Sequence, residues 1–337
     1  MNLLSWRLFC MAVLLALAMA TPTVVNAQAQ PMTEIPLGSG TSLSGASTQS
    51  MDGATSLEGD VGGGGSAATT NGPEAAAFDG TYIWVATQFT NSVTRIRVKD
   101  STVAGTFAVG KRPVALIYAA SYLWVANLEG DNLMKIAPST GAVVATYATG
   151  DGPGGLAFDG TNIWVANRNA NTVTKLKASS GGNLGTFAVG KRPISIAFFA
   201  NALWVTNNFG NSVTKLSTAG AVLGTYATGR GAYGVAGAGD SVYVSNFFAK
   251  TVTRLRAADG VNLGTFTVGD GAAGVLSDGT NLWVALHGDD AVVKMTRDGS
   301  IISKYATGNG PFSIAFDGVR VWLPNSGSDS VSVTAAN

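Results

Sequence analysis

Short apolar runs alternate with polar turn residues along most of this chain. In one representative stretch the runs are Gly154–Phe158, Asn162–Ala166, Thr172–Lys177 and Leu184–Val189. They are rich in Val, Ile, Thr, Phe and Trp, and turn residues such as Asp159-Gly160 separate them. No stretch has helical spacing, so the pattern predicts short antiparallel strands joined by tight turns.

This unit of four runs recurs seven times around a fixed aromatic residue. The aromatic positions are Trp84, Trp124, Trp164, Trp204, Tyr243, Trp283 and Trp322, separated by 40, 40, 40, 39, 40 and 39 residues. Four strands per repeat predict an all-β fold, a seven-bladed β-propeller of four-stranded blades. A linear solenoid is the alternative, but it would need polar end repeats, and the terminal repeats here resemble the inner ones. We expect each aromatic residue to wedge between neighbouring blades.

The seventh repeat lacks a fourth strand. Fourth strands are expected around Phe107, Tyr147, Phe187, Tyr226, Phe266 and Tyr305, and the chain stops at Val331–Asn337, after the third strand of its last repeat. We therefore expect a strand from before Gly72 to close the ring, which would remove an open sheet edge. Ser56–Val61 is nearer in sequence, whereas Thr33–Leu37 is more apolar.

The N-terminal residues are typical of an export signal. Residues 1–27 contain Arg7, the apolar run Leu8–Ala20 and the cleavage-site pattern Val25-Asn26-Ala27, and the run is too short to span a bilayer. Cleavage would remove Cys10, the only cysteine, and leave no transmembrane segment. Residues 28–71 are rich in Gly, Ser and Thr and predict a flexible tether with a possible closing strand. Residues 72–337 would form the propeller, in the periplasm or secreted.

Composition narrows the classes of partner. Only 12% of the 337 residues are charged and the net charge is +1, against about 25% charged in ordinary domains. Because no global field would attract nucleic acid, we expect none as a partner. We expect the partner to be another protein or a small molecule. We also expect this chain to be a monomer.

Two motifs resemble those of known propeller families. Trp204-Val205-Thr206-Asn207 and Tyr243-Val244-Ser245-Asn246 resemble the signature of YVTN-type bacterial propellers. The pattern at Gly310–Gly318 is similar to virginiamycin B lyase and to NHL-type propellers. The resemblance covers about residues 72–337. It implies a ring whose first strands line the axis and whose ligands sit on one face.

The lyase resemblance implies a histidine base, acidic neighbours and a magnesium ion, commonly with Glu three residues after the Trp. This chain has Thr87, Asn127, Asn167, Asn207, Asn246, Leu286 and Asn325 at those places. Its single histidine is His287, followed by Gly288, Asp289 and Asp290. One interpretation is therefore a streptogramin lyase-like or hydrolase-like enzyme, with His287 as base and Asp289 and Asp290 holding Mg²⁺ or Ca²⁺.

The first interpretation is a non-catalytic propeller without a cofactor. Loops after second and fourth strands share one face of a propeller, and basic residues cluster there in blades 3 to 5. The predicted ligand-binding residues are Arg168, Lys191, Arg192, Phe209, Arg230, Tyr233, Phe247 and Lys250. They would bind an acidic sugar, a phosphorylated ligand or an acidic partner loop. A solvated rim is the alternative for this face, and an envelope scaffold is a third function.

The residues that follow Gly-Pro, or its equivalent, in each repeat form a further predicted set. They are Glu74, Val114, Gly154, Ile194, Tyr233, Ala273 and Phe312. We expect them to ring the axial mouth. Glu74 is the only acid among them, which disfavours a metal site built from several carboxylates on the axis.

Overall fold

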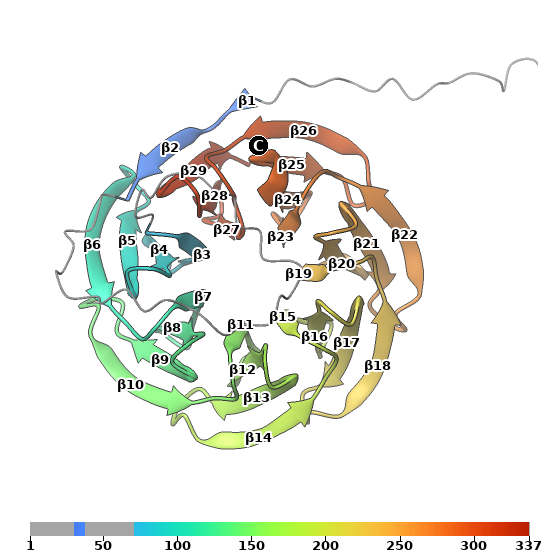
Figure 1. The fold of residues 1–337 in the computed structure, drawn as a ribbon, viewed down its shortest axis with the longest axis horizontal. Coiled ribbons are helices and arrows are strands. Elements are labelled where there is room, and N and C mark those ends of the chain that lie inside the picture. Colours follow the sequence, from blue (N-terminus) through green and yellow to red (C-terminus); the bar gives the residue numbers. More distant parts are fainter. Residues whose placement is uncertain (1–29, 38–70, 337) are drawn as a thin grey trace, which may run out of the picture.

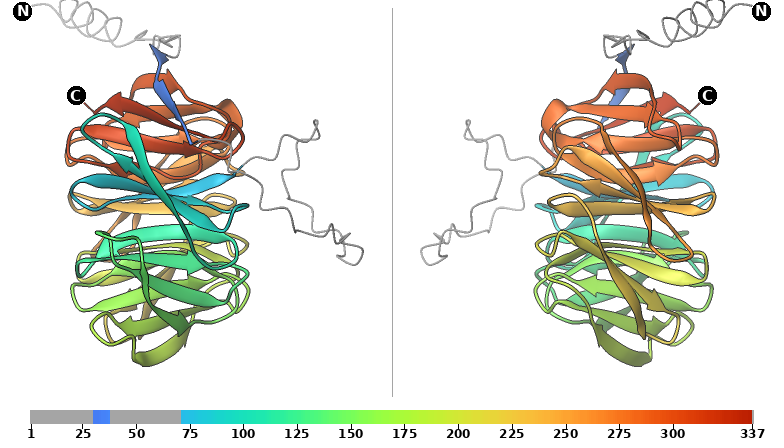
Figure 2. Two further views of the ribbon diagram at one scale, coloured as in Figure 1. Left: turned by 90° about the vertical axis from the view of Figure 1, so that its left-hand side faces the viewer. Right: turned by 90° about the vertical axis from the view of Figure 1, so that its right-hand side faces the viewer.

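The computed structural model describes residues 30–37 and 71–336. Seven sheets surround a central axis, and each has an inner strand at the axis and an outer strand at the rim (Figure 1). Edge-on, the ring is a disc (Figure 2). The all-β, seven-bladed propeller is confirmed, and the inner strands line the axis as the resemblance implied. The expected signal peptide lies outside the described residues.

The first four blades each contain four consecutive antiparallel strands. Blade 1 comprises β3 (Pro73–Phe78), β4 (Tyr82–Thr87), β5 (Ser92–Arg97) and β6 (Thr102–Ala108). Blade 2 comprises β7 (Pro113–Ala119), β8 (Tyr122–Asn127), β9 (Asn132–Ile136) and β10 (Val143–Ala148). Blade 3 comprises β11 (Pro153–Phe158), β12 (Asn162–Asn167), β13 (Thr172–Lys177) and β14 (Asn183–Ala188). Blade 4 comprises β15 (Pro193–Phe199), β16 (Ala202–Asn207), β17 (Ser212–Ser217) and β18 (Val222–Ala227).

The last three blades include the N-terminal strands. Blade 5 comprises β19 (Ala232–Ala238), β20 (Ser241–Asn246), β21 (Thr251–Arg256) and β22 (Asn262–Thr267). Blade 6 comprises β23 (Ala272–Ser277), β24 (Leu282–Leu286), β25 (Ala291–Met295), β26 (Ile301–Ala306) and the added β1 (Gln30–Pro31). Blade 7 comprises β27 (Ala315–Phe316), β28 (Arg320–Asn325), β29 (Ser330–Ala335) and β2 (Thr33–Pro36). A short 3₁₀ helix, η1 (His287–Asp289), follows β24.

The ring is closed by the more apolar of the two candidate segments. Strand β2 pairs antiparallel with β29, with Ile35 opposite Val331. Ile35 and Leu37 are buried in a cluster that joins blades 7 and 1. Strand β1 runs parallel to β26 on the rim of blade 6, so the N-terminal segment contacts two blades. Closure by an N-terminal strand is confirmed, while Ser56–Val61 lies outside the described residues.

The repeated aromatic residue packs against the next blade, as expected. Trp164 of blade 3 is fully buried against Ile196 and Leu203 of blade 4. Trp322 of blade 7 packs in the same way on Ile83 of blade 1. The same contact therefore recurs across the closure as well as within the chain.

An aspartate gives four of the Trp side chains a hydrogen-bond acceptor. Asp159 Oδ1 accepts from the backbone N–H groups of Thr161 and Asn162, which fixes the hairpin turn. Its Oδ2 accepts from Trp164 Nε1 at 2.7 Å. Asp79, Asp278 and Asp317 repeat the indole contact. The sequence pattern predicted the Asp-Gly turn but not this second role.

A cation on the third strand links most blades to the next one. Lys175, opposite Trp164 in the sheet, has Nζ 5.0 Å from the indole centroid and donates to Thr218 O of blade 4 at 2.7 Å. Arg95, Lys135, Lys215 and Lys294 make equivalent contacts with the next blade. Blade 7 uses Arg320, whose Nη2 donates to Val98 O of blade 1. We call these contacts the inter-blade straps.

Candidate functional site

The loops of one face are fixed by side chains from the turns between second and third strands. Asn171 has a positive φ of 56° and accepts from Arg192 N at 2.7 Å. Asp290, with φ 48°, likewise accepts from Gly310 N at 2.8 Å. Asn91, Asp131, Asn211 and Asp329 make the same kind of contact. Short polar residues tolerate this left-handed conformation best, so the sequence places the loops rigidly around the axis.

The asparagine of the repeated motif is a second structural element of this face. Asn207 is fully buried, and its Nδ2 donates to Ser212 Oγ and Thr214 Oγ1. Its Oδ1 accepts from Gly190 N in the loop that enters blade 4. A Cβ on Gly190 would lie 2.4 Å from the Asn207 side chain, so glycine is required there. Buried amides with several partners hold the loops and are not available to a ligand.

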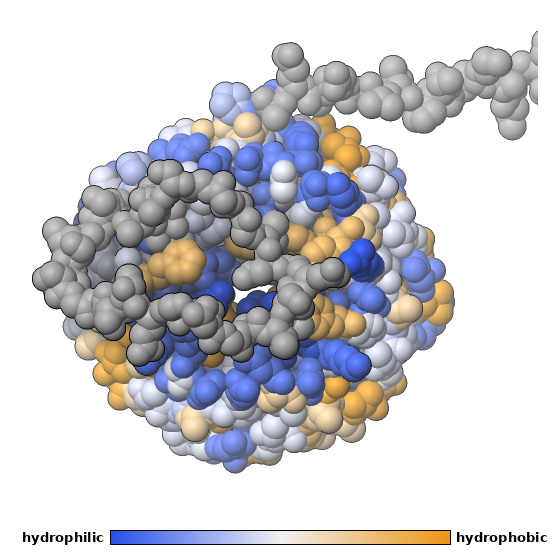
Figure 3. Space-filling view, in the orientation of Figure 1, coloured by the Kyte–Doolittle hydropathy of each residue, from blue (hydrophilic) through white to orange (hydrophobic). Residues whose placement is uncertain are grey.

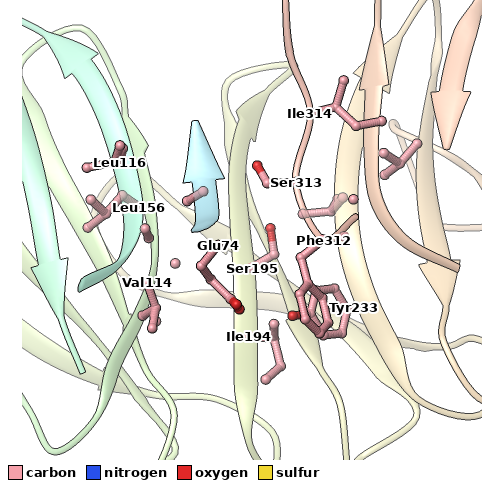
Figure 4. A pocket seen from close by; sticks show the side chains of 18 of the residues that line it. Glu74, Val114, Leu116, Leu156, Ile194, Ser195, Tyr233, Phe312, Ser313 and Ile314 are labelled. Carbon is pink, nitrogen blue, oxygen red and sulfur yellow. The ribbon is translucent and has the colours of Figure 1, made fainter. Parts of the chain in front are cut away.

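The axial mouth on this face is hollow. A cavity of about 300 Å³ opens there, and a second of about 180 Å³ continues into the channel between the inner strands. Their shared lining residues are Glu74, Val114, Arg168, Ile194, Tyr233 and Phe312. Glu74 points from β3 into the space beside Ile194, across from the rings of Tyr233 and Phe312 (Figure 4). Viewed along the axis, strongly hydrophilic residues lie beside the central opening, with apolar residues flanking them (Figure 3).

A polar network occupies one side of this mouth cavity. Gln88 Nε2 donates to Glu74 Oε2 at 3.2 Å, and Arg112 Nε donates to Gln88 Oε1 at 3.2 Å. Arg112 also pairs with Glu129 at 3.2 Å near the surface. Arg168 and Arg192 complete the basic lining. Arg168 Nε is buried and has no hydrogen-bond partner among the described residues.

Burial sets the protonation of Glu74. Loss of water around its carboxylate raises the pKa to about 7, and the charges of Arg168 and Arg112 oppose this only in part. Both protonation states are therefore populated near neutral pH. The protonated acid can donate a hydrogen bond, and the ionised acid can neutralise one guanidinium.

Aromatic side chains form the other side of the cavity. Phe312 lies between Tyr233, 5.9 Å away between ring centroids, and His287, 4.0 Å away, with both pairs stacked. Phe247 contacts both Tyr233 and His287. Burial raises the pKa of Tyr233 and lowers the pKa of His287, whose charged form receives only partial support from Asp290. His287 is therefore mainly neutral at pH 7, in contrast to the solvent-exposed histidine usual for a loop.

The predicted binding residues do not all reach the cavity. Arg168, Arg192, Tyr233 and Phe247 line it together. The other four do not line it. The ring centroid of Phe209 lies 4.3 Å from the guanidinium of Arg192, and the guanidinium of Arg230 lies over the ring of Phe248. Lys250 forms an ion pair with Asp270 at 2.7 Å, and Lys191 is exposed. The cavity therefore includes only part of the predicted basic sector.

Several residues that line the cavity were not among the predicted binding residues, and Glu74, Phe312 and Arg112 are three of them. Glu74 and Phe312 belong to the set predicted to ring the axial mouth. Their position was therefore predicted, but their part in a binding site was not. Six members of that set line the channel, and Gly274 takes the place of Ala273. Arg112 belongs to a between-blade loop on the same face, but it lies in sequence far from the cluster in blades 3 to 5.

The two candidate metal ligands have other partners. Asp289 Oδ2 accepts from Lys304 Nζ at 2.9 Å and from Asp270 N at 3.2 Å. Asp290 Oδ1 holds Gly310 N. In residues 30–37 and 71–336, no three His, Cys, Asp or Glu side chains are grouped closely enough to hold a metal ion. Over the same part of the chain, no helix has the length and apolar character needed to cross a membrane.

Comparison with known proteins supports the fold. No family model matches this chain, and no curated protein matches it by sequence. A virginiamycin B lyase from Staphylococcus aureus matches with a TM-score of 0.70 and 18% identity, over 78% of this chain and 95% of that chain. A chain of Kuenenia stuttgartiensis hydrazine synthase matches with a TM-score of 0.73 and 18% identity, over 82% of this chain and 99% of that one.

A chain of a mitotic checkpoint complex matches with a TM-score of 0.70 and 13% identity, over 79% of this chain and 91% of that chain. These likenesses show the fold, and proteins with very different names share it. The suspected likeness to propellers of the virginiamycin B lyase type is confirmed for the fold.

Proposed function

We propose that this protein is an exported, non-catalytic propeller that binds a small anionic ligand in the mouth cavity. The observation that carries the proposal is the convergence of Arg112, Arg168 and Arg192 on a single cavity whose opposite wall is aromatic. Guanidinium groups recognise carboxylate and phosphate oxygens through paired hydrogen bonds. The aromatic wall would exclude water and strengthen those contacts. The predicted signal peptide supports export to the periplasm or the medium.

Cavity size favours a small ligand over a protein segment. A volume of about 300 Å³ is at the lower end of the range of about 300–1,000 Å³ for small-molecule sites. Loops held by the turn side chains and by Asn207 would preorganise the cavity, which lowers the entropic cost of binding. An acidic loop of a protein partner remains the competing occupant, and chains of the same fold occur in a multi-protein checkpoint complex.

The proposal is tested by the Arg168→Met variant. Calorimetric titration with glucuronate, glucose 6-phosphate and benzoate should detect at least one ligand for the purified protein. Removal of the Arg168 charge should weaken ligand binding at least tenfold, because a charge-assisted contact contributes about 1.5–3 kcal/mol. Lys191→Met is the matched control, since Lys191 is exposed and outside the cavity. Equal affinity in wild type and Arg168→Met would contradict the assignment of the site.

A lyase-like or hydrolase-like activity is the second candidate function. It is favoured by the position of His287 in the cavity wall and by the burial that keeps the ring neutral, which suits a general base. Mg²⁺ or Ca²⁺ at Asp289 and Asp290 would have to displace the contacts with Lys304 and Gly310. Turnover of an ester substrate that requires both the cation and His287, and fails in His287→Ala, would replace the binding proposal.

A further inference from the structure

Glu74 lies at the junction of the two axial cavities. It lines both the mouth cavity and the channel below it, and its carboxylate is directed into the space that they share (Figure 4). Only one hydrogen bond from a side chain, that of Gln88, reaches it among the described residues. A carboxyl group has more hydrogen-bonding capacity than one donor satisfies. Glu74 is therefore placed to contact whatever occupies the cavity.

Charged and titratable groups face Glu74 from several elements. Arg112, on the loop before β7, and Arg168, on the loop after β12, interact with its charge. Tyr233 on β19 is close enough for the charge of Glu74 to raise its pKa. Arg192, before β15, and His287, on η1, line the same cavity. With Glu129 beside Arg112, three guanidiniums face two acids, so the site has one excess positive charge when both acids are ionised.

We infer that the ligand of this cavity is a small organic carboxylate, and that Glu74 takes up one proton from solvent when the ligand binds. The inference rests on the proposed function and assigns both the class of ligand and its dependence on pH. The incoming carboxylate would lie between the guanidiniums and Glu74. Two ionised carboxylates at that distance repel each other, whereas a protonated Glu74 can donate a hydrogen bond to the ligand. The proton binds a carboxylate oxygen of Glu74, and no covalent bond to the ligand forms.

The composition of the cavity wall favours an organic acid over inorganic phosphate. Val114, Ile194 and Phe312 face the same space as the guanidiniums. An apolar body gains free energy by covering these side chains, at about 25 cal/mol per Å² of apolar surface. A fully hydrated dianion gains nothing there. Protonation of Glu74 raises the excess positive charge of the site from one to two, which a carboxylate would then partly neutralise.

Benzoate is the probe for this inference, with benzamide as its neutral analogue and inorganic phosphate as the competing anion. Calorimetry at pH 8, in HEPES and in Tris, counts protons through the different ionisation heats of the buffers. We expect uptake of close to one proton per benzoate, because Glu74 is mostly ionised there before binding. The affinity should fall by up to about tenfold from pH 7 to pH 8.

Two variants isolate the role of Glu74. In Glu74→Gln the amide can donate without titrating, so benzoate should bind with an affinity independent of pH. Glu129→Gln, the matched control, removes an exposed acid on Arg112 and should keep the pH dependence. Benzoate binding without proton uptake, or a pH dependence that survives in Glu74→Gln, would overturn the inference while leaving the anion site intact. Preference for phosphate or for benzamide would overturn the ligand class. If none of the anions binds at any pH, the proposed function itself fails.

Discussion

At the scale of single residues, Glu74 destabilises the folded protein at alkaline pH. Its pKa is about 7 in the fold, against 4.5 for the ordinary side chain. A raised pKa means that the stability linked to the bound proton is fully present below pH 4.5 and is lost as the pH rises to 7. The shift corresponds to about 3 kcal/mol of unfolding free energy. A carboxyl group whose pKa is shifted this far, with this loss of folding free energy, is typical of a functional site.

The Glu74→Gln variant should therefore be more stable than wild type at pH 8, by up to about 3 kcal/mol, because its amide does not ionise. At pH 4.5 most of that difference should vanish. Urea titrations at the two pH values measure it. A free-energy difference that is the same at both would show that Glu74 does not titrate with a raised pKa.

Residue roles were predictable from the sequence only where a repeated position carried the signal. The Asp-Gly pairs recur in register, and their turns were expected. The hydrogen bond from Trp164 to Asp159 could not be predicted, because the sequence pattern does not specify this contact across the hairpin. A buried Trp at this position does not require such an acceptor: Trp204 of blade 4 is equally buried, and its Nε1 has no partner among the described residues.

At the scale of elements, each second strand places its buried aromatic side chain against the next blade. The Trp164→Ala variant should lose about 3–5 kcal/mol of unfolding free energy, because it leaves a large cavity beside Ile196 and Leu203. Denaturant titration measures the loss. Lys177→Met on the exposed side of β13 is the control and should be nearly neutral. A loss below 1 kcal/mol for Trp164→Ala would mean that the wedge contributes little.

The sequence predicted the elements well because period and composition agree. Alternating apolar positions and fixed turns define the strands, and the recurrence of Trp defines the blades. The inter-blade straps were not predicted. Lys175 looks like an ordinary exposed strand residue in the sequence, yet it lies against Trp164 and reaches Thr218 O. Only the packing of two blades brings that carbonyl within reach.

At the scale of the whole molecule, the binding site depends on ring geometry. The cavity joins Glu74 and Arg112, from the start of the propeller, to Phe312 near its end. In a closed ring the first and last blades are neighbours, so residues separated by most of the chain line the same cavity. A cluster of charges in consecutive blades therefore indicated only Arg168, Arg192 and their neighbours. The sequence could not show which loop residues lean toward the axis and which lean outward, as Lys250 does.

Closure should be sensitive to the N-terminal strand. The Ile35→Asp variant places a charge in the buried cluster that joins blades 7 and 1. We expect a loss of several kcal/mol, because an unpaired buried charge is strongly unfavourable. Thermal melting compares it with Thr33→Ala, which alters an exposed residue of the same strand. An unchanged melting temperature in Ile35→Asp would show that β2 contributes little to ring stability.

The straps described above also determine how the molecule can come apart. Since Arg320 links blade 7 to blade 1, the first and last blades hold each other, and there is no terminal unit from which fraying could start. Any blade that detaches must give up two interfaces at once, whereas an end repeat of an open array gives up one. Amide hydrogens in the middle strands of all seven blades should therefore exchange with solvent through one shared global event, at nearly equal rates.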